Sequence, residues 1–192
     1  MKMRITGGRY KGRRIAFPPG EIRPAMDRMR ESMFAILGDL TGFSFLDLFS
    51  GSGSVGIEAA SRGASPVMLV ESDGRKRKIL TQNASIVETV ISLRFSRAER
   101  FIKSCEEIFD ILFLDPPFSY QKKESLLHQI VHSDLLGKDA LVLIHHPWKE
   151  ELPAQTGLLY RFDERRYGQS QLTFYRSTSS THFSQRSINP PL

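Results

Sequence analysis

The sequence predicts an α/β fold, a mostly parallel sheet of seven strands with helices on both faces. Five short apolar runs between residues 43 and 146 alternate with helix-like segments, and parallel strands need such crossover helices. Two later runs, residues 157–168 and 170–176, follow each other closely and predict a closing antiparallel pair. At 192 residues, the chain is expected to form one domain, residues 27–176, with a short addition at each end.

The elements can be placed in order along the chain. Glycine and proline punctuate residues 1–26, which predicts a small hairpin or extended arm and not a helix. Met26, Met29, Met33 and Leu37 recur at helical spacing and predict an amphipathic helix that ends near Gly38. Strands are then expected at 43–49, 66–71, 91–95, 109–114 and 140–146, and helices at 54–63, 74–85, 98–105 and 122–133.

Composition limits the classes of protein that the chain can be. Its single cysteine, Cys105, excludes an internal disulfide and a multi-cysteine zinc site, which suits a reducing cytoplasm. No run approaches the roughly 18 apolar residues of a membrane span, and the basic N-terminus lacks the apolar stretch of a secretory signal. The Ser-rich residues 177–192 predict a disordered tail. We therefore expect a soluble, cytoplasmic protein that is a monomer.

Positive charge is concentrated at the start of the chain. Residues 1–30 contain nine lysines and arginines against two acids, whereas the formal net charge of the whole chain is +6. Such a cluster is typical of a segment that contacts the phosphate backbone of a nucleic acid; the alternative is a solvated arm that only aids solubility. The candidate RNA-binding residues are Arg4, Arg9, Lys11, Arg13, Arg14 and Arg28.

A glycine-rich loop follows the first expected strand. Gly51, Gly53 and Gly56 match the dinucleotide-binding pattern G-x-G-x-x-G, and they stand between a strand and a helix, as that pattern requires. Glycines there let a ligand approach the backbone closely. Glu71 ends the next strand, where an acid can accept hydrogen bonds from both ribose hydroxyls of a nucleoside. The combination favours a cofactor with an adenosine group; a helix-packing turn is the alternative.

The charge of Asp47 distinguishes between two cofactors that use this architecture. A carboxylate just before the glycines would repel the pyrophosphate of NAD at the helix N-terminus. The same carboxylate can hold the ammonium and sulfonium end of S-adenosylmethionine (SAM). An acid that stabilises the helix dipole is the alternative, but Asp47 stands somewhat too early in the strand for that role. We therefore predict SAM as the cofactor.

A proline motif, Asp115, Pro116, Pro117 and Phe118, follows the fourth expected strand and reaches the same edge of the sheet. One proline is enough to stop a strand, so the whole motif indicates chemistry. Methyl transfer to an exocyclic amine of a base needs an oriented nitrogen whose developing charge is stabilised and whose protons are accepted. Asp115 can accept one N–H, the Pro116 carbonyl can accept the other, and Phe118 can stack on the base. A plain strand terminator is the alternative.

Four blocks, within residues 3–176, resemble the RsmD-type 16S ribosomal RNA guanine-N2 methyltransferases, which have the Rossmann-like fold of class I SAM-dependent enzymes. The blocks are ITGGR with KGR, RP with DRMRE, LDLFSGSGSVGIEAASRGA, and FDILFLDPPF. The resemblance implies that the arm contacts RNA, that SAM binds at the glycine loop and that the proline motif holds the target amine. It places cofactor or pocket-rim residues at Arg23, Asp27, Arg30, Asp47, Phe49, Ser50, Gly51, Ser52, Gly53, Glu71, Ser72 and Ala98, and catalytic residues at Asp115, Pro116, Pro117 and Phe118.

Two positions depart from that family. Arg97 stands where relatives often carry an acid or amide near the adenine ring; an arginine cannot accept the adenine amino proton, which leaves the Ala98 backbone for that role. Relatives tend to end the fifth strand with an acid, whereas this chain has His145 and His146. Adjacent strand residues point to opposite faces, so we expect ordinary strand-end histidines and no metal.

Other functions remain open at this point. A DNA or RNA adenine-N6 or cytosine-N4 methyltransferase would use the same proline motif, although sequence-specific DNA enzymes usually need more chain to read bases. A non-catalytic RNA-binding module would use the basic arm alone. A nicotinamide oxidoreductase would share the glycine loop but leave the proline motif unexplained. The resemblance favours 16S rRNA as the substrate. Because one domain leaves no separate target-reading module, we further hypothesise that the RNA context, in a partly assembled small ribosomal subunit, supplies much of the selectivity.

Overall fold

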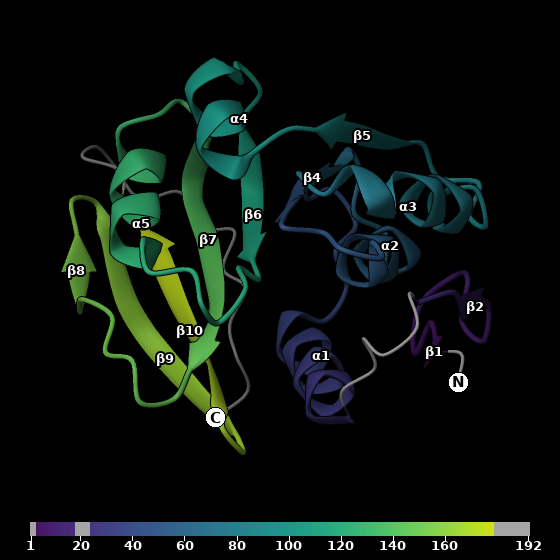
Figure 1. The fold of residues 1–192 in the computed structure, drawn as a ribbon, viewed down its shortest axis with the longest axis horizontal. Coiled ribbons are helices and arrows are strands. Elements are labelled where there is room, and N and C mark those ends of the chain that lie inside the picture. The colour runs from purple at the N-terminus through teal and green to yellow at the C-terminus, as the bar shows by residue number, and fades with distance from the viewer. Residues whose placement is uncertain (1–2, 18–23, 179–192) are drawn as a thin grey trace.

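The structure, a computed structural model, describes residues 3–17 and 24–178. Arg23 and residues 179–192 of the expected tail lie outside these ranges. The main sheet has the strand order β5, β4, β3, β6, β7, β10, β9, β8 (Figure 1). Its strands are β3 (Phe45–Leu48), β4 (Val67–Glu71), β5 (Ile91–Phe95), β6 (Phe109–Leu114), β7 (Leu136–Pro147), β8 (Gln155–Thr156), β9 (Leu159–Tyr167) and β10 (Ser170–Ser177). The helices are α1 (Pro24–Leu37), α2 (Ser54–Ser61), α3 (Arg77–Ala84), α4 (Ala98–Ser104) and α5 (Lys123–Val131), and a 3₁₀ turn, η1 (Gly74–Lys76), precedes α3.

The α/β class expected from the sequence is confirmed. The strands β5, β4, β3, β6 and β7 are parallel, and β10 runs antiparallel to both β7 and β9. The described sheet has eight strands and not the seven predicted, because β8 pairs with β9 at its outer edge. With two residues, Gln155 and Thr156, β8 is too short for an alternating apolar pattern to reveal it.

The strand order reverses between β3 and β6. From β3 the chain builds β4 and β5 on one side, and then it crosses back to build β6 and β7 on the other. Leu48 of β3 lies opposite Leu114 of β6 in a parallel register. In open α/β sheets, ligands bind beyond the carboxyl ends of the strands at such a reversal. The register therefore brings the residues after Leu48 and those after Leu114 to one edge of the sheet.

Alternating side chains of the strands hold helices on both faces, as predicted. Phe45 and Phe113 belong to a buried cluster with residues of α1, α2 and α3, whereas their neighbours Leu46 and Leu112 belong to a second cluster with residues of α4 and α5. Figure 1 shows α4 and α5 together over the β6 and β7 half of the sheet. The two clusters fix the strands from both sides and keep their carboxyl ends in place.

The helix predicted before the first strand is α1. It begins at Pro24, where proline is tolerated because the first N–H groups of a helix have no partner within it. It buries Met29, Met33 and Leu37 against the sheet. Gly38 follows with φ 70°, a left-handed conformation that commonly ends helices.

The N-terminal arm is a two-stranded hairpin in which β1 (Met3–Arg4) pairs with β2 (Arg14–Ile15). It docks on α2 through Glu58, whose side chain is fully buried. The Glu58 carboxylate accepts hydrogen bonds from the backbone N–H groups of Thr6 (2.8 Å) and Gly7 (2.9 Å). Gly8 approaches α2 so closely that a Cβ there would lie 1.8 Å from the Ser61 carbonyl oxygen. A side chain at Gly8 is therefore incompatible with this docking.

Candidate functional site

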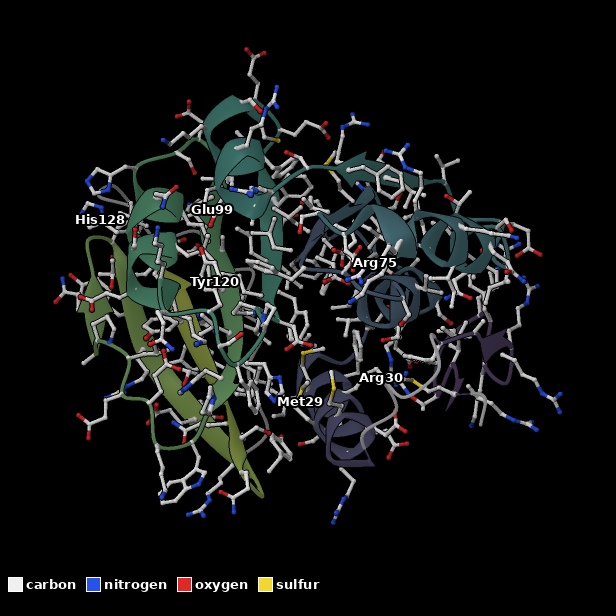
Figure 2. The ribbon with its side chains drawn as sticks, in the orientation of Figure 1. Met29, Arg30, Arg75, Glu99, Tyr120 and His128 are labelled. Carbon is white, nitrogen blue, oxygen red and sulfur yellow. The ribbon has the colours of Figure 1, made fainter. Side chains whose placement is uncertain are left out.

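A cavity of about 640 Å³ opens beyond the carboxyl ends of β3, β4, β6 and β7. The loops after these strands form much of its wall, and α1 borders it with Met29 and Arg30, which Figure 2 labels. Most of the cofactor and catalytic candidates line this cavity, namely Asp27, Arg30, Asp47, Phe49, Ser50, Gly51, Ser52, Glu71, Ser72, Asp115, Pro116, Pro117 and Phe118. The residues predicted for the site thus gather around one cavity, at the edge where the strand order reverses.

The loop after β3 has an unusual backbone. Phe49 has φ 68° and Gly51 has φ 57°. A phenylalanine rarely adopts this conformation, which costs about 1–3 kcal/mol and is found mainly at functional sites. Gly51 donates its N–H to Glu71 Oε2 at 2.8 Å. A Cβ at Gly51 would meet only Lys76 Nζ, at 4.0 Å, so the backbone there is open to a ligand in the cavity.

Two candidate cofactor residues do not line the cavity. A Cβ at Gly53 would lie 2.6 Å from Leu80 Cδ1, so Gly53 is required by the packing of α3 against the loop. Gly56, the third glycine of the pattern, is likewise close to Leu69, since a Cβ added at Gly56 would lie 2.1 Å from Leu69 Cδ2. Ala98 begins α4 with its side chain buried in the second core cluster. Of the three glycines, Gly51 is therefore the one placed to touch a cofactor, and a role for the Ala98 backbone stays a prediction.

Two buried acids stand beside the glycine loop. Asp47 is 1% exposed, and its Oδ2 accepts the N–H of Gly56 at 3.1 Å. Burial is the main cause that raises the pKa of Asp47 well above its ordinary value; the Gly56 N–H opposes this, and the nearby Asp115 and Glu71 add to it. Glu71 accepts the N–H groups of Gly51 and Asp73, at 2.8 and 2.7 Å. Such a group of acids favours a ligand that carries positive charge.

The proline motif forms the opposite wall of the cavity. The N–H of Asp115 donates to the Leu48 carbonyl at 3.3 Å, which continues the pairing of β6 with β3 by one residue. The Pro117 carbonyl accepts the N–H of Tyr120 at 2.8 Å. The Pro116 carbonyl, in contrast, receives no hydrogen bond from any residue in the described ranges. It is therefore available to a donor in the cavity.

Tyr120 fixes the loop that carries the proline motif. Its hydroxyl donates to Glu99 Oε1 at 2.6 Å, and Figure 2 shows these two side chains between α4 and that loop. Burial and the hydrogen bond to Glu99 raise the pKa of Tyr120 above its ordinary value. The ring of Tyr120 also meets the ring of Phe49 edge to face, with centroids 5.5 Å apart. The two walls of the cavity are thus in contact.

His145 is a site residue that the sequence analysis missed. The two histidines do point to opposite sides of β7, as expected, but only His146 is an ordinary core residue, with its Nε2 hydrogen-bonded to Thr173 Oγ1 at 2.8 Å. His145 lines the cavity, and its Nδ1 lies 2.8 Å from Asp115 Oδ1. The pairing of β6 with β7, which no local pattern reveals, brings these two residues together.

The rim contributed by α1 combines an acid with a buried cation. Arg30 Nη1 lies 2.7 Å from Glu58 Oε2, and Arg30 Nη2 lies 3.7 Å from Asp27 Oδ1. Arg30 Nη2 also donates to the Arg4 carbonyl in the arm at 3.3 Å. The guanidinium therefore connects the arm, α2 and the cavity wall.

The candidate RNA-binding cations are on the surface. Arg4, Arg9, Lys11, Arg13, Arg14 and Arg28 are all exposed. Arg13 forms an ion pair with Glu88 at 2.8 Å and hydrogen-bonds to the Ile86 carbonyl, and its guanidinium stacks on the ring of Tyr10. Arg9 also lies near the Tyr10 ring, 5.5 Å from its centroid. The arm thus presents several cations on one short hairpin.

Within residues 3–17 and 24–178, no group of three or more His, Cys, Asp or Glu side chains is arranged to hold a metal ion. In the same part of the chain, none of the helices has the length and apolar character needed to cross a membrane. Burial raises the pKa of the Cys105 thiol, which is the reverse of what a reactive thiolate requires.

The fold is that of a methyltransferase. The solved structure described as "Putative methyltransferase yhhF from Escherichia coli" matches with a TM-score of 0.83 and 28% sequence identity, over 94% of this chain and 100% of that one. A Bacillus subtilis protein named "Putative rRNA methyltransferase YlbH" is 33% identical over 181 residues, which cover 91% of this chain and 98% of that protein.

The family follows from two further matches. A family model described as "Conserved hypothetical protein 95" matches residues 3–176. The protein of Escherichia coli K12 named "Ribosomal RNA small subunit methyltransferase D" is 31% identical over 159 residues, which cover 79% of this chain and 78% of that protein. The chain therefore belongs to this family, that of the RsmD-type methyltransferases, as its four sequence blocks predicted.

Proposed function

We propose that this protein transfers the methyl group of SAM to the exocyclic N2 amine of a guanine in 16S ribosomal RNA. The observation that carries the proposal is the shared cavity, because the proline motif, the open backbone at Gly51 and the buried acids all line one space. The names of the relatives support ribosomal RNA as the class of substrate.

The residues of the cavity fit SAM. Bound there, SAM supplies an electrophilic methyl group on a positively charged sulfur. Asp47 is buried and forms no ion pair with any lysine or arginine of the described ranges, so a cationic ammonium group would neutralise it. Each carboxylate oxygen of Glu71 accepts one backbone N–H and keeps a lone pair for a ribose hydroxyl. Gly51 leaves the backbone free for close approach. This combination of charges fits SAM better than it fits a pyrophosphate.

The proline motif fits an exocyclic amine. Asp115 accepts one N–H of the amine and the Pro116 carbonyl accepts the other, which directs the nitrogen lone pair at the methyl carbon. With SAM bound, its methyl group would pass from sulfur to the amine and leave S-adenosylhomocysteine, and the negative charge of Asp115 would stabilise the positive charge that develops on nitrogen. The extra proton then leaves the nitrogen toward Asp115. Phe118, at the cavity wall, stacks on the base.

The substrate must be held by contacts outside the cavity as well. The exposed cations of the arm supply phosphate contacts that do not depend on base sequence. Guanine, adenine and cytosine each carry an exocyclic amine with two N–H groups, so the proline motif alone does not choose among them. We therefore assign much of the selectivity to the surrounding RNA in a partly assembled small subunit, and an equal rate on a short naked hairpin would contradict that assignment.

The test is methyl transfer from labelled SAM to small-subunit particles, to their extracted RNA and to DNA, with the labelled nucleoside identified by mass spectrometry. We expect N2-methylguanosine in RNA, and a loss of transfer for Asp115→Asn, which keeps the shape but removes the charge. The matched control is Asp139→Asn, an exposed residue with φ 56° at the far end of β7, where asparagine is tolerated. Label in adenine or cytosine would overturn the guanine assignment, and SAM binding without transfer to any acceptor would overturn the enzymatic one.

A further inference from the structure

His145 and Asp115 lie side by side near the carboxyl ends of the neighbouring strands β7 and β6. In the parallel pairing of β6 with β7, Leu114 lies opposite Ile144, and each is followed directly by one of the two residues. The distance between His145 Nδ1 and Asp115 Oδ1 is 2.8 Å. The His145 side chain is 3% exposed and that of Asp115 is 20% exposed. Asp115 is thus the member of the pair that the cavity solvent reaches.

The hydrogen bond defines which nitrogen of His145 carries the proton. A carboxylate only accepts hydrogen bonds, so Nδ1 must be the donor. The other nitrogen, Nε2, is buried and has no hydrogen-bond partner among the described residues. A neutral ring that donates from Nδ1 places a lone pair at Nε2, and this leaves no buried N–H without an acceptor. Of the two neutral tautomers, the geometry therefore selects the one that donates to Asp115.

His145 also contacts a second member of the proline motif. The ring centroids of Phe118 and His145 are 5.4 Å apart, at an interplanar angle of 59°. One side chain on a rigid strand therefore supports both the carboxylate that would face the amine and the ring that would stack on the base. Tyr120, by contrast, supports the loop from its other end.

We propose that His145 is a positioning residue for methyl transfer, an inference that rests on the proposed function. It donates to Oδ1 of Asp115, which leaves Oδ2 as the oxygen that accepts the N–H of the acceptor amine. It also supports the ring of Phe118 at the angle needed to stack on the base. The first contact acts on the orientation of the reacting nitrogen and the second acts on binding of the base.

Two substitutions separate these contacts. His145→Asn keeps an N–H donor at about the place of Nδ1 but removes the ring, whereas His145→Phe keeps a ring but removes the donor. Misplacement of a reacting group by about 1 Å costs on the order of 100-fold in rate. We therefore expect His145→Phe to lower kcat by about 10- to 100-fold with little change in KM for RNA. We expect His145→Asn to retain kcat within a few-fold and to raise KM for RNA.

The assay is steady-state methyl transfer to small-subunit particles, with SAM affinity by calorimetry and thermal unfolding measured for each variant. The inference predicts unchanged SAM affinity for both variants and the opposite effects on kcat and KM described above. Wild-type kcat in His145→Phe would overturn it, and so would equal losses in both variants, because a merely structural histidine would affect them alike. If the wild-type protein transfers no methyl group to RNA, the proposed function itself fails. An active wild-type protein together with a His145→Phe variant of the same kcat would refute this inference alone.

Discussion

Substitution by alanine is expected to affect mainly stability at one glycine of the loop and mainly SAM affinity at another. Gly51 and Gly53 both have positive φ, 57° and 80°, so alanine at either position adds the strain of a left-handed backbone. That strain costs about 1–2 kcal/mol. The surroundings differ, because a Cβ at Gly51 has one neighbour at 4.0 Å, whereas a Cβ at Gly53 has Leu80 Cδ1 at 2.6 Å and Leu69 Cδ1 at 3.1 Å.

The magnitudes follow from these distances. Inserting a methyl group into a packed core costs about 1–3 kcal/mol beyond the backbone strain. We therefore expect Gly53→Ala to lower the free energy of unfolding by about 2–5 kcal/mol and Gly51→Ala to lower it by about 1–2 kcal/mol. For SAM affinity the larger loss is expected in Gly51→Ala, since its methyl group would occupy cavity space that a ligand needs. SAM affinity is expected to fall about tenfold or more in Gly51→Ala, a loss of about 1.4 kcal/mol.

Urea unfolding followed by circular dichroism measures the first effect, and calorimetric titration with SAM, at a temperature where both variants are folded, measures the second. The wild-type protein and Gly74→Ala are the controls, because Gly74 has no neighbour near its Cβ position and an ordinary φ. The assignment of Gly51 to the cofactor and Gly53 to packing is refuted if Gly53→Ala keeps wild-type stability while losing SAM, or if Gly51→Ala binds SAM as well as the wild type.

Three further predictions concern charge. The pKa of Asp47 in the folded protein is raised above its ordinary value of 3.8, so its contribution to stability is present below that value and is lost as pH rises through the folded pKa. In the absence of SAM, Asp47→Asn is expected to make the protein more stable near neutral pH and to flatten the pH dependence of its free energy of unfolding in urea. The same substitution is expected to weaken SAM binding. Glu58→Ala removes the nearest acid from buried Arg30, with Asp27 remaining at 3.7 Å, and is expected to lower the free energy of unfolding by about 3–5 kcal/mol. It is also expected to speed proteolysis of the arm, unlike Glu88→Ala at the exposed pair with Arg13. Arg9→Glu and Arg14→Glu are expected to weaken RNA binding whatever the RNA sequence. The slope of the logarithm of the association constant against the logarithm of the salt concentration should fall by about one per lost phosphate contact. An unchanged slope in a filter-binding titration would remove those residues from the RNA interface.

Local patterns predicted the parallel strands well, because a strand buried on both faces is a run of apolar residues. They failed where an element has little apolar content. The strand β7 begins at Leu136 and not at residue 140, and its first turn-like residues, Gly137, Lys138 and Asp139, resemble a loop. The helix predicted at 74–85 is divided into η1 and α3 at Arg77. For β7, pairing of Leu136 with Phe109 of β6 sets the start of the strand, whereas η1 begins at a local cap in which the Asp73 side chain accepts the N–H of Arg75.

The sequence predicted most of the residues that line the cavity, but it did not predict how they contact one another. Gly51 and Gly53 are equivalent in a G-x-G-x-x-G pattern, and only the positions of Leu80 and Leu69 distinguish them. His145 escaped notice for a similar reason, since its partner Asp115 lies 30 residues earlier in the chain. The parallel register of β6 and β7 brings the pair together, and a register between distant strands is not written in either strand alone. Sequence patterns therefore identify which segments meet at the site, whereas individual contacts require the fold.

A single buried charge helps to fix the position of the arm relative to the cavity. Glu58 forms ion pairs with Arg30 at 2.7 Å and with Arg62 at 3.0 Å, while it accepts the backbone N–H groups of Thr6 and Gly7. Breaking such a network from one side leaves a buried charge without a partner, so the arm, α1 and α2 are held as a unit. Arg30 also lines the cavity. For an arm that binds RNA phosphates, this network sets a fixed distance between the phosphate contacts and the proline motif. That geometry favours a substrate in which the target base already projects from a folded RNA over a base in a freely flexible strand.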